Sequence, residues 1–84
     1  MAKIYVEVTT PGNGKTYEFQ LDSLMTVGQV KMKMINEIVE LENGNITLQP
    51  EKTMLYNLNS RIHLNEISNV KTAGIKSGQT LLLL

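Results

Sequence analysis

Few residues in this 84-residue chain have types and spacings that could do chemistry, and a glycine-rich turn is the first of them. Gly12-Asn13-Gly14-Lys15 followed by Thr16 has the ending of a phosphate-binding loop. That motif needs a glycine, four further residues and then Gly-Lys-Ser/Thr entering a helix. Here Gly12 stands only two residues before Gly14, and the residues after the turn alternate as a strand does. The sequence therefore predicts no nucleotide site.

The composition excludes most kinds of metal site and most covalent chemistry. The chain has no cysteine and a single histidine, His63, so it lacks the residues for a disulfide, a thiolate site, a cysteine nucleophile or a conventional multi-histidine metal site. His63 could act as a pH switch or a lone ligand, but a solvent-facing histidine on an edge strand is the favoured interpretation. The Ser, Asp and Glu residues show no nucleophile–base pairing. We predict no catalytic residue, no metal, no cofactor and no enzymatic activity.

Charge and hydropathy limit the classes of partner that the chain can be expected to bind. Eight Lys and Arg residues balance eight Asp and Glu residues, and nucleic-acid binding needs a basic excess. No apolar run approaches the ~20 residues of a membrane span, and the N-terminal segment alternates like a strand. Hydrophobic residues make up 42% of the chain, enough for one core. We therefore expect a single cytoplasmic domain over residues 1–84, with no nucleic acid and no direct membrane insertion.

The N-terminal segments predict a hairpin followed by a helix. Residues 3–9 and 16–21 each alternate apolar and polar residues on either side of the glycine-rich turn, the pattern of a hairpin. Thr26 and Gln29 have the spacing of a capping box, and Asn43-Gly44 is a stop signal. The apolar residues between them recur at steps of three and four, as in an amphipathic helix: Val27, Val30, Met34, Ile38 and Leu41. The charged helix residues could form a docking face, but a solvated surface is favoured: Lys31, Lys33, Glu37 and Glu40.

The second half predicts three short strands. Residues 45–53 look like a loop, and residues 54–58 and 61–64 look like a strand and its return. Residues 65–74 are polar and irregular, with Ile67 and Val70 as expected anchors in the core. The terminal segment 80–84 carries four consecutive leucines, typical of a central strand.

This element order predicts an α+β fold of the β-grasp type. We expect a mixed sheet of about five strands, with the first and last strands adjacent at its centre and one helix packed across one face.

At the level of residues, the chain resembles ubiquitin-like proteins. Lys3-Ile4-Tyr5-Val6 and the helix opening from Thr26 to Met34 are similar to strings of ubiquitin, and the segment from Gly74 to Leu81 looks like the approach to the family's last strand. The resemblance covers nearly the whole chain, and it supports the fold more than the function.

Two departures from ubiquitin shape the functional expectation. Conjugated modifiers end in a diglycine tail, whereas this sequence has no glycine after Gly78 and ends at Leu84. We therefore expect neither conjugation nor sulfur-carrier chemistry. The position of ubiquitin's receptor-binding isoleucine on the third strand aligns with Asn57, so we expect ordinary ubiquitin receptors not to bind this surface.

The sequence is most similar to the small YukD/EsaB-type proteins of bacterial type VII (ESX/WXG100) secretion loci. The likeness runs without gaps from Met54 to Leu84, and Thr16-Leu21 resembles their second strand. It implies a cytoplasmic accessory or regulatory component that acts by protein–protein contact, with a membrane or ATPase component of the secretion system as its partner. The alternative is an unrelated ubiquitin-like adaptor or scaffold domain with no role in secretion.

A candidate interaction surface follows from strand alternation. If Leu81 and Leu83 point inward, four apolar residues are expected on the outer sheet face, opposite the helix: Tyr5, Leu55, Leu82 and Leu84. Contiguous exposed apolar side chains commonly mark a partner surface. The alternatives are docking through an edge strand of the sheet, isolated exposed residues without a role, or a homodimer contact. A one-residue slip in register would invert the assignment.

Overall fold

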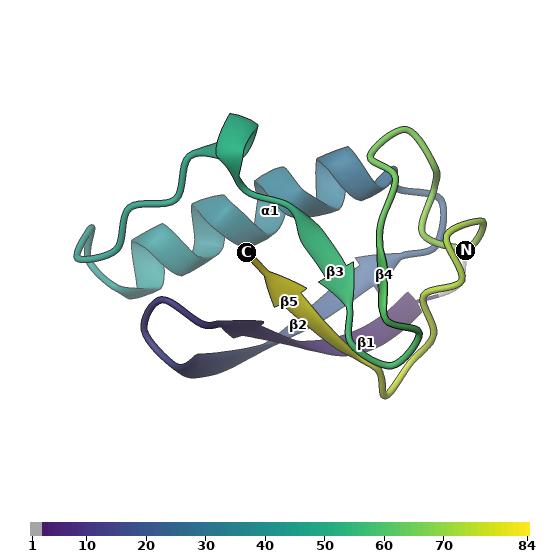
Figure 1. The fold of residues 1–84 in the computed structure, drawn as a ribbon, viewed down its shortest axis with the longest axis horizontal. Coiled ribbons are helices and arrows are strands. Elements are labelled where there is room, and N and C mark those ends of the chain that lie inside the picture. The colour runs from purple at the N-terminus through teal and green to yellow at the C-terminus, as the bar shows by residue number, and fades with distance from the viewer. Residues whose placement is uncertain (1–2) are drawn as a thin grey trace.

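The helix and the sheet form two layers in the computed structural model, which describes residues 3–84 (Figure 1). The elements in chain order are β1 Lys3–Thr10, β2 Lys15–Asp22, α1 Val27–Leu41, the 3₁₀ turn η1 Pro50–Lys52, β3 Leu55–Asn57, β4 Ile62–His63 and β5 Thr80–Leu83. The strand order in the sheet is β2-β1-β5-β3-β4. The β1–β5 pair is parallel and the other pairs are antiparallel. This is the α+β β-grasp arrangement that the sequence predicts.

The N-terminal hairpin depends on its turn. The carbonyl of Thr10 accepts hydrogen bonds from the amides of Asn13 and Gly14, at 3.2 and 2.9 Å. The side-chain oxygen of Asn13 accepts a further hydrogen bond from the amide of Lys15, at 3.0 Å. Gly14 has a φ of 68°, which glycine adopts without steric cost. The turn thereby fixes the register in which Val6 faces Phe19.

The ends of α1 are stabilised as the sequence indicates. The Thr26 hydroxyl accepts from the amide of Gln29 at 3.1 Å, and the Gln29 side chain accepts from the amide of Thr26 at 3.0 Å. After the last turn, Asn43 and Gly44 take positive φ values of 54° and 75°. The amide of Gly44 donates to the carbonyl of Val39 at 2.9 Å. The predicted capping box and helix stop are both confirmed.

The loop after β4 satisfies the first amides of the helix. The amides of Val27 and Gly28 donate to the carbonyls of Ser68 and Glu66, at 2.8 and 3.0 Å. These amides have no partner within the helix itself. A Cβ at Gly28 would stand 3.3 Å from the Glu66 carbonyl oxygen, so the close approach of loop and helix favours glycine.

The core lies between α1 and the inner face of the sheet. Its fully buried side chains come from the sheet, the helix and the loop: Val8, Leu21, Val27, Val30, Met34, Ile38, Leu55, Val70, Leu81 and Leu83. Leu81 and Leu83 point inward as expected. Five-stranded pairing and one covering helix leave the other sheet face without a layer above it among residues 3–84.

Two expectations about core residues are wrong. Ile67 is 85% exposed, although Val70 is buried as predicted. The tight turn after Asn65 aims the carbonyls of Glu66 and Ser68 at the helix, and this leaves Ile67 at the tip. Leu41 is 65% exposed at the end of the helix.

Lys31 is a further exception, because it is buried rather than part of a solvated helix surface. Its ammonium donates to the carbonyl of Pro50 at 2.7 Å. The segment 45–53, expected as a loop, contains the 3₁₀ turn η1 that presents this carbonyl.

Candidate functional site

The outer face of the sheet carries a row of apolar side chains around β5. Leu82 is paired with Tyr56, which is paired in turn with His63 on β4. Directly opposite residues share a face of the sheet, so these three side chains all point away from α1. Leu84 and Met54 exchange two backbone hydrogen bonds, of 2.9 and 3.0 Å, and extend the row.

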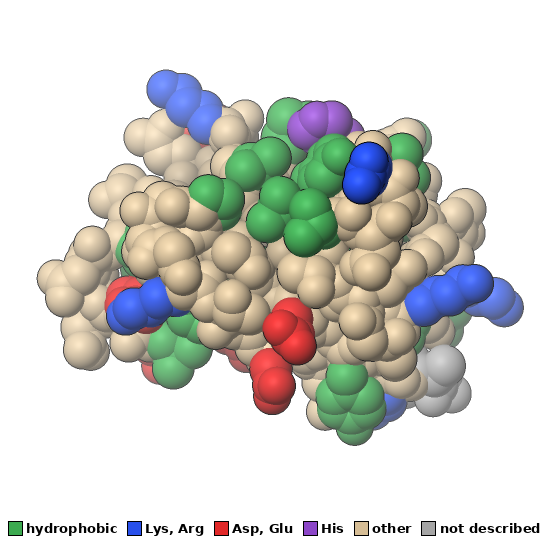
Figure 2. Space-filling model, turned by 60° about the horizontal axis from the view of Figure 1, so that its bottom comes forward, with side chains coloured by type: hydrophobic (Ala, Val, Ile, Leu, Met, Phe, Trp, Pro, Cys, Tyr) green, Lys and Arg blue, Asp and Glu red, His purple; other side chains and the backbone are tan. Residues whose placement is uncertain are grey.

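We call this set the outer-face patch: Met54, Tyr56, His63, Leu82 and Leu84. Met54 is 48% and Leu84 50% exposed, and Tyr56 and Leu82 are half-buried. Figure 2 shows the hydrophobic side chains gathered beside the single histidine. The Tyr56 and His63 rings meet edge to face, with centroids 5.1 Å apart. The patch is apolar and partly aromatic, a composition that suits contact with another protein.

Of the predicted surface residues, the structure brings Leu82 and Leu84 together. Leu55 was expected beside them, but that expectation is wrong because it is only 1% exposed. The register places Leu55 opposite Leu83, and Leu83 points into the core. The predicted parity of β3 was therefore shifted by one residue relative to β5.

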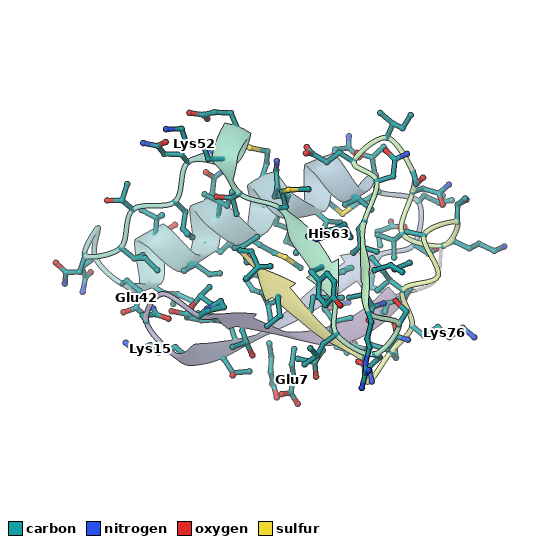
Figure 3. All side chains as sticks on the ribbon, viewed as in Figure 1. Glu7, Lys15, Glu42, Lys52, His63 and Lys76 are labelled. Atoms are coloured by element: carbon teal, nitrogen blue, oxygen red, sulfur yellow. The ribbon has the colours of Figure 1, made fainter. Side chains whose placement is uncertain are left out.

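Tyr5 lies on the outer face but apart from the patch. It is 61% exposed, and it is four residues along β1 from Thr9, the residue paired with Leu82. Glu7 lies between them and faces Glu18 on β2. Acidic side chains are visible beside the hydrophobic cluster in Figure 2, and Figure 3 shows Glu7 pointing away from the helix. Tyr5 and the patch are thus separated by carboxylates.

The same shift in parity affects Asn57. Asn57 is 1% exposed and does not lie on the outer face. Its amide group donates to the Gln79 side chain at 3.1 Å and its oxygen accepts from the amide of Asn59 at 3.0 Å. It holds the turn after β3, and Tyr56 is the residue of β3 that faces outward.

Sequence reasoning missed Met54, Tyr56 and His63 as members of the patch. The signal that could have found them is the pairing of β3 with β5. Once Leu81 and Leu83 are set inward, an antiparallel register of Leu55 with Leu83 turns Tyr56 and Met54 outward. Alternation gives the parity within each strand, but the register between two distant strands must come from the fold.

The glycine-rich turn has a structural role at the end of the hairpin. The Lys15 ammonium lies 2.7 Å from a Glu42 carboxylate oxygen, just after the end of α1 (Figure 3). The Tyr17 hydroxyl donates to the other oxygen at 2.9 Å. The hydrogen bond from Lys15, followed by that from Tyr17, lowers the pKa of Glu42. The Glu42 carboxylate in turn raises the pKa of Lys15. These contacts join the hairpin to the helix end.

Among residues 3–84, no group of three or more His, Cys, Asp and Glu side chains could hold a metal ion. No helix in this part of the chain is long and apolar enough to cross a membrane. The outer-face patch is the candidate functional site among these residues.

Comparisons with known proteins agree on the fold. No family model matches the chain, and no curated protein sequence matches it. Among solved structures, it is similar to the ubiquitin-like domain of an Arabidopsis thaliana protein, with 25% identity and a TM-score of 0.73 over 100% of this chain and 78% of that one. Ubiquitin of Caldiarchaeum subterraneum gives 19% identity and a TM-score of 0.72 over 98% and 91%. The N-terminal ubiquitin-like domain of the 4931431F19Rik protein gives 21% and 0.70 over 98% and 73%.

The strand order, the crossing helix and these structural neighbours define one class. The chain has the ubiquitin-like β-grasp fold.

Proposed function

We propose that this chain is a non-conjugated, non-enzymatic interaction module that docks on a protein partner through its outer-face patch. The observation that carries the proposal is the difference between the two faces of the sheet. α1 covers the inner face, whereas the outer face presents Met54, Leu82 and Leu84 in a row with Tyr56. Fully burying one exposed leucine or methionine side chain is worth roughly 1.5–3 kcal/mol. A few such residues around an aromatic ring suffice for a specific contact.

We further propose that the module is a cytoplasmic accessory of a bacterial type VII secretion system. The support is the resemblance of the segment from Met54 to Leu84 to the YukD/EsaB-type proteins, together with that of Thr16-Leu21. The first segment contains every member of the outer-face patch. The expected partner is a membrane or ATPase component of the system.

A quantitative affinity capture tests both parts of the proposal. The bait variant Met54→Ser/Leu84→Ser removes the two most exposed apolar side chains of the patch. Ile67→Ser is the matched control, because Ile67 is 85% exposed in the loop after β4. Each bait is first checked by circular dichroism and urea unfolding, and captured proteins from the source organism are quantified by mass spectrometry.

Three results are informative. Capture of a secretion ATPase or membrane component by wild type and Ile67→Ser, but not by the patch variant, supports the whole proposal. Equal capture by all three baits removes the outer-face patch from it. Capture of other proteins through the patch would indicate an adaptor with no role in secretion.

A further inference from the structure

A second surface lies along the free edge of β2, on the far side of the sheet from β3 and β4. β2 is the first strand of the sheet order, and no other strand among residues 3–84 pairs with its outer side. A strand edge of this kind presents unpaired backbone groups that another chain can bind. The feature is independent of the outer-face patch.

The register identifies which groups face this edge. The amide of Glu7 donates to the carbonyl of Gln79, and the carbonyl of Tyr5 accepts from the amide of Gly78. These two β1 residues therefore direct their backbone toward β5, and the alternate residues Val6 and Val8 bond to β2. In an antiparallel pair only every second residue exchanges hydrogen bonds. Glu18 and Thr16, which face Glu7 and Thr9, thus direct their amides and carbonyls at the open edge.

The helix covers only one end of this edge. The Lys33 ammonium donates to the carbonyl of Gln20 at 3.2 Å, which confirms that Gln20 also points outward. The Lys33 contact leaves the outward backbone amides and carbonyls of Glu18 and Thr16 free to bind an added strand. A groove of about 580 Å³ opens between this part of β2 and the last turns of α1. Tyr17 and Phe19 line it from the strand, and the exposed Leu41 from the helix.

Carboxylates surround the groove. Glu18, Glu37 and Glu40 line it. The two ion pairs among residues 3–84 involve other carboxylates, those of Glu42 and Glu66. Lys15, the cation closest in sequence to this end of β2, is held by Glu42. The Lys33 ammonium lies at the Gln20 end of this edge. The three carboxylates that line the groove outnumber it, so the groove is net negative and a cationic occupant is complementary to it.

We propose that the β2 edge binds an extended, basic peptide segment of a partner protein as an added strand. Backbone hydrogen bonds would form with Glu18 and Thr16. Lysine or arginine stems would lie over Phe19 and Leu41 while their charged ends reach the carboxylates. A second copy of this chain fits less well, because two β2 edges would bring the same carboxylates together. The inference goes beyond the proposed function, since it uses a different surface.

The test uses the full chain and a synthetic peptide that alternates lysine and valine over roughly seven residues. A matched peptide carries glutamate in place of lysine. Amide chemical shifts and affinities are measured by NMR titration at low and high salt. Glu37→Lys/Glu40→Lys reverses the charge of the groove, and Glu51→Lys on η1 is the charge-matched control. Glu18→Pro removes an edge amide that β1 does not use, a position where a strand tolerates proline.

We expect the lysine peptide to shift the amides of residues 16–20 and to bind more weakly as salt increases. Glu37→Lys/Glu40→Lys and Glu18→Pro should each weaken binding about tenfold or more. Glu51→Lys and Met54→Ser/Leu84→Ser should leave it unchanged. The last variant also separates this inference from the proposed function.

Several results would overturn the inference. They are equal binding of the glutamate peptide, shifts confined to the outer-face patch, no binding at millimolar peptide, or a dimer that blocks the β2 edge in sedimentation experiments. If Glu18→Pro fails to fold, the charge-reversal variant still decides the question, because its substitutions lie on the exposed side of α1.

Discussion

The Lys31 ammonium lies 3.0 Å from the Glu66 carboxylate, and the two partners differ sharply in exposure. The Lys31 side chain is 6% exposed and the Glu66 side chain 53%. Lys31 also donates to the carbonyl of Pro50 at 2.7 Å. One buried cation thus connects α1 to η1 on one side and to the loop after β4 on the other. Because of this arrangement, removing Lys31 and removing Glu66 should change the free energy of unfolding by different amounts.

Removing the exposed partner should cost more than removing the buried one. Glu66→Ala leaves a buried ammonium with a single acceptor, and we expect it to lower the free energy of unfolding by about 1–2 kcal/mol. Lys31→Met keeps the apolar stem and removes the buried charge, so we expect a loss below about 1 kcal/mol. The double variant should resemble Lys31→Met alone. Urea unfolding of the four proteins measures these differences. A Glu66→Ala variant as stable as wild type would show that water already solvates Lys31.

The contact of Lys15 with Glu42 should make stability depend on pH. Lys15 and Tyr17 hold the pKa of Glu42 below its ordinary value of 4.5. Because the folded pKa is the lower one, the stabilisation is fully present above pH 4.5 and is lost as the pH falls through the folded value. Glu42 raises the pKa of Lys15 above 10.5, so the same stabilisation is lost as the pH rises through that higher value.

Glu42→Gln isolates this dependence. Its stability should fall below that of wild type near neutral pH, and the two proteins should converge as the pH falls below the folded pKa of Glu42. Glu40→Gln is the control, because Glu40 forms no ion pair among residues 3–84. Urea unfolding across this pH range gives the comparison. A constant difference between wild type and Glu42→Gln at every pH would contradict the role of the charge.

The capping box at the start of α1 should contribute measurably to stability. Thr26→Ala removes the acceptor for the amide of Gln29, and we expect a loss of about 1 kcal/mol. Thr26→Ser retains the hydroxyl and should remain close to wild type. Thermal unfolding by circular dichroism compares the variants. Equal losses for both substitutions would assign the effect to the methyl group of Thr26 rather than to the hydrogen bond.

The sequence predicted the local features of this fold well, because their causes are local. The spacing of Thr26 and Gln29 is enough to predict the helix start, and the turn residues are enough to predict the hairpin. Leu81 and Leu83, which were assumed to point inward, do lie in the core. Each of these features depends on residues a few positions apart, whose geometry is nearly independent of the rest of the chain.

Apart from the exposed Leu41 at the helix end, the errors concern long-range arrangement. Leu55 and Asn57 were placed on the wrong face because the register of β3 on β5 depends on chain segments more than twenty residues apart. Ile67 is exposed because the loop carries carbonyls to the helix amides, a requirement that its own apolarity does not reveal. Lys31 is buried because η1 and Glu66 supply partners from two other segments. The candidate site depends on register, and the sequence therefore identified only part of it.

Glu7 and Glu18 face each other directly across β1 and β2, and both are exposed. Like charges at directly opposite positions destabilise an antiparallel pair, whereas opposite charges contribute roughly 0.2–1 kcal/mol. Glu7→Lys and Glu18→Lys should therefore each raise the free energy of unfolding by about 0.5 kcal/mol, and the double substitution should cancel the gain. The gain should shrink in high salt, as exposed charges are screened.

The two single variants should differ in binding although they match in stability. Glu18→Lys places a cation at the β2 edge, so it should weaken binding of the lysine peptide. Glu7→Lys changes a residue whose backbone faces β5, so it should weaken this binding less. Urea unfolding and the NMR titration, run on the same samples, measure both effects. If Glu7→Lys and Glu18→Lys reduce the affinity for the lysine peptide equally, the peptide responds to the overall charge of the sheet face and does not pair with the β2 edge.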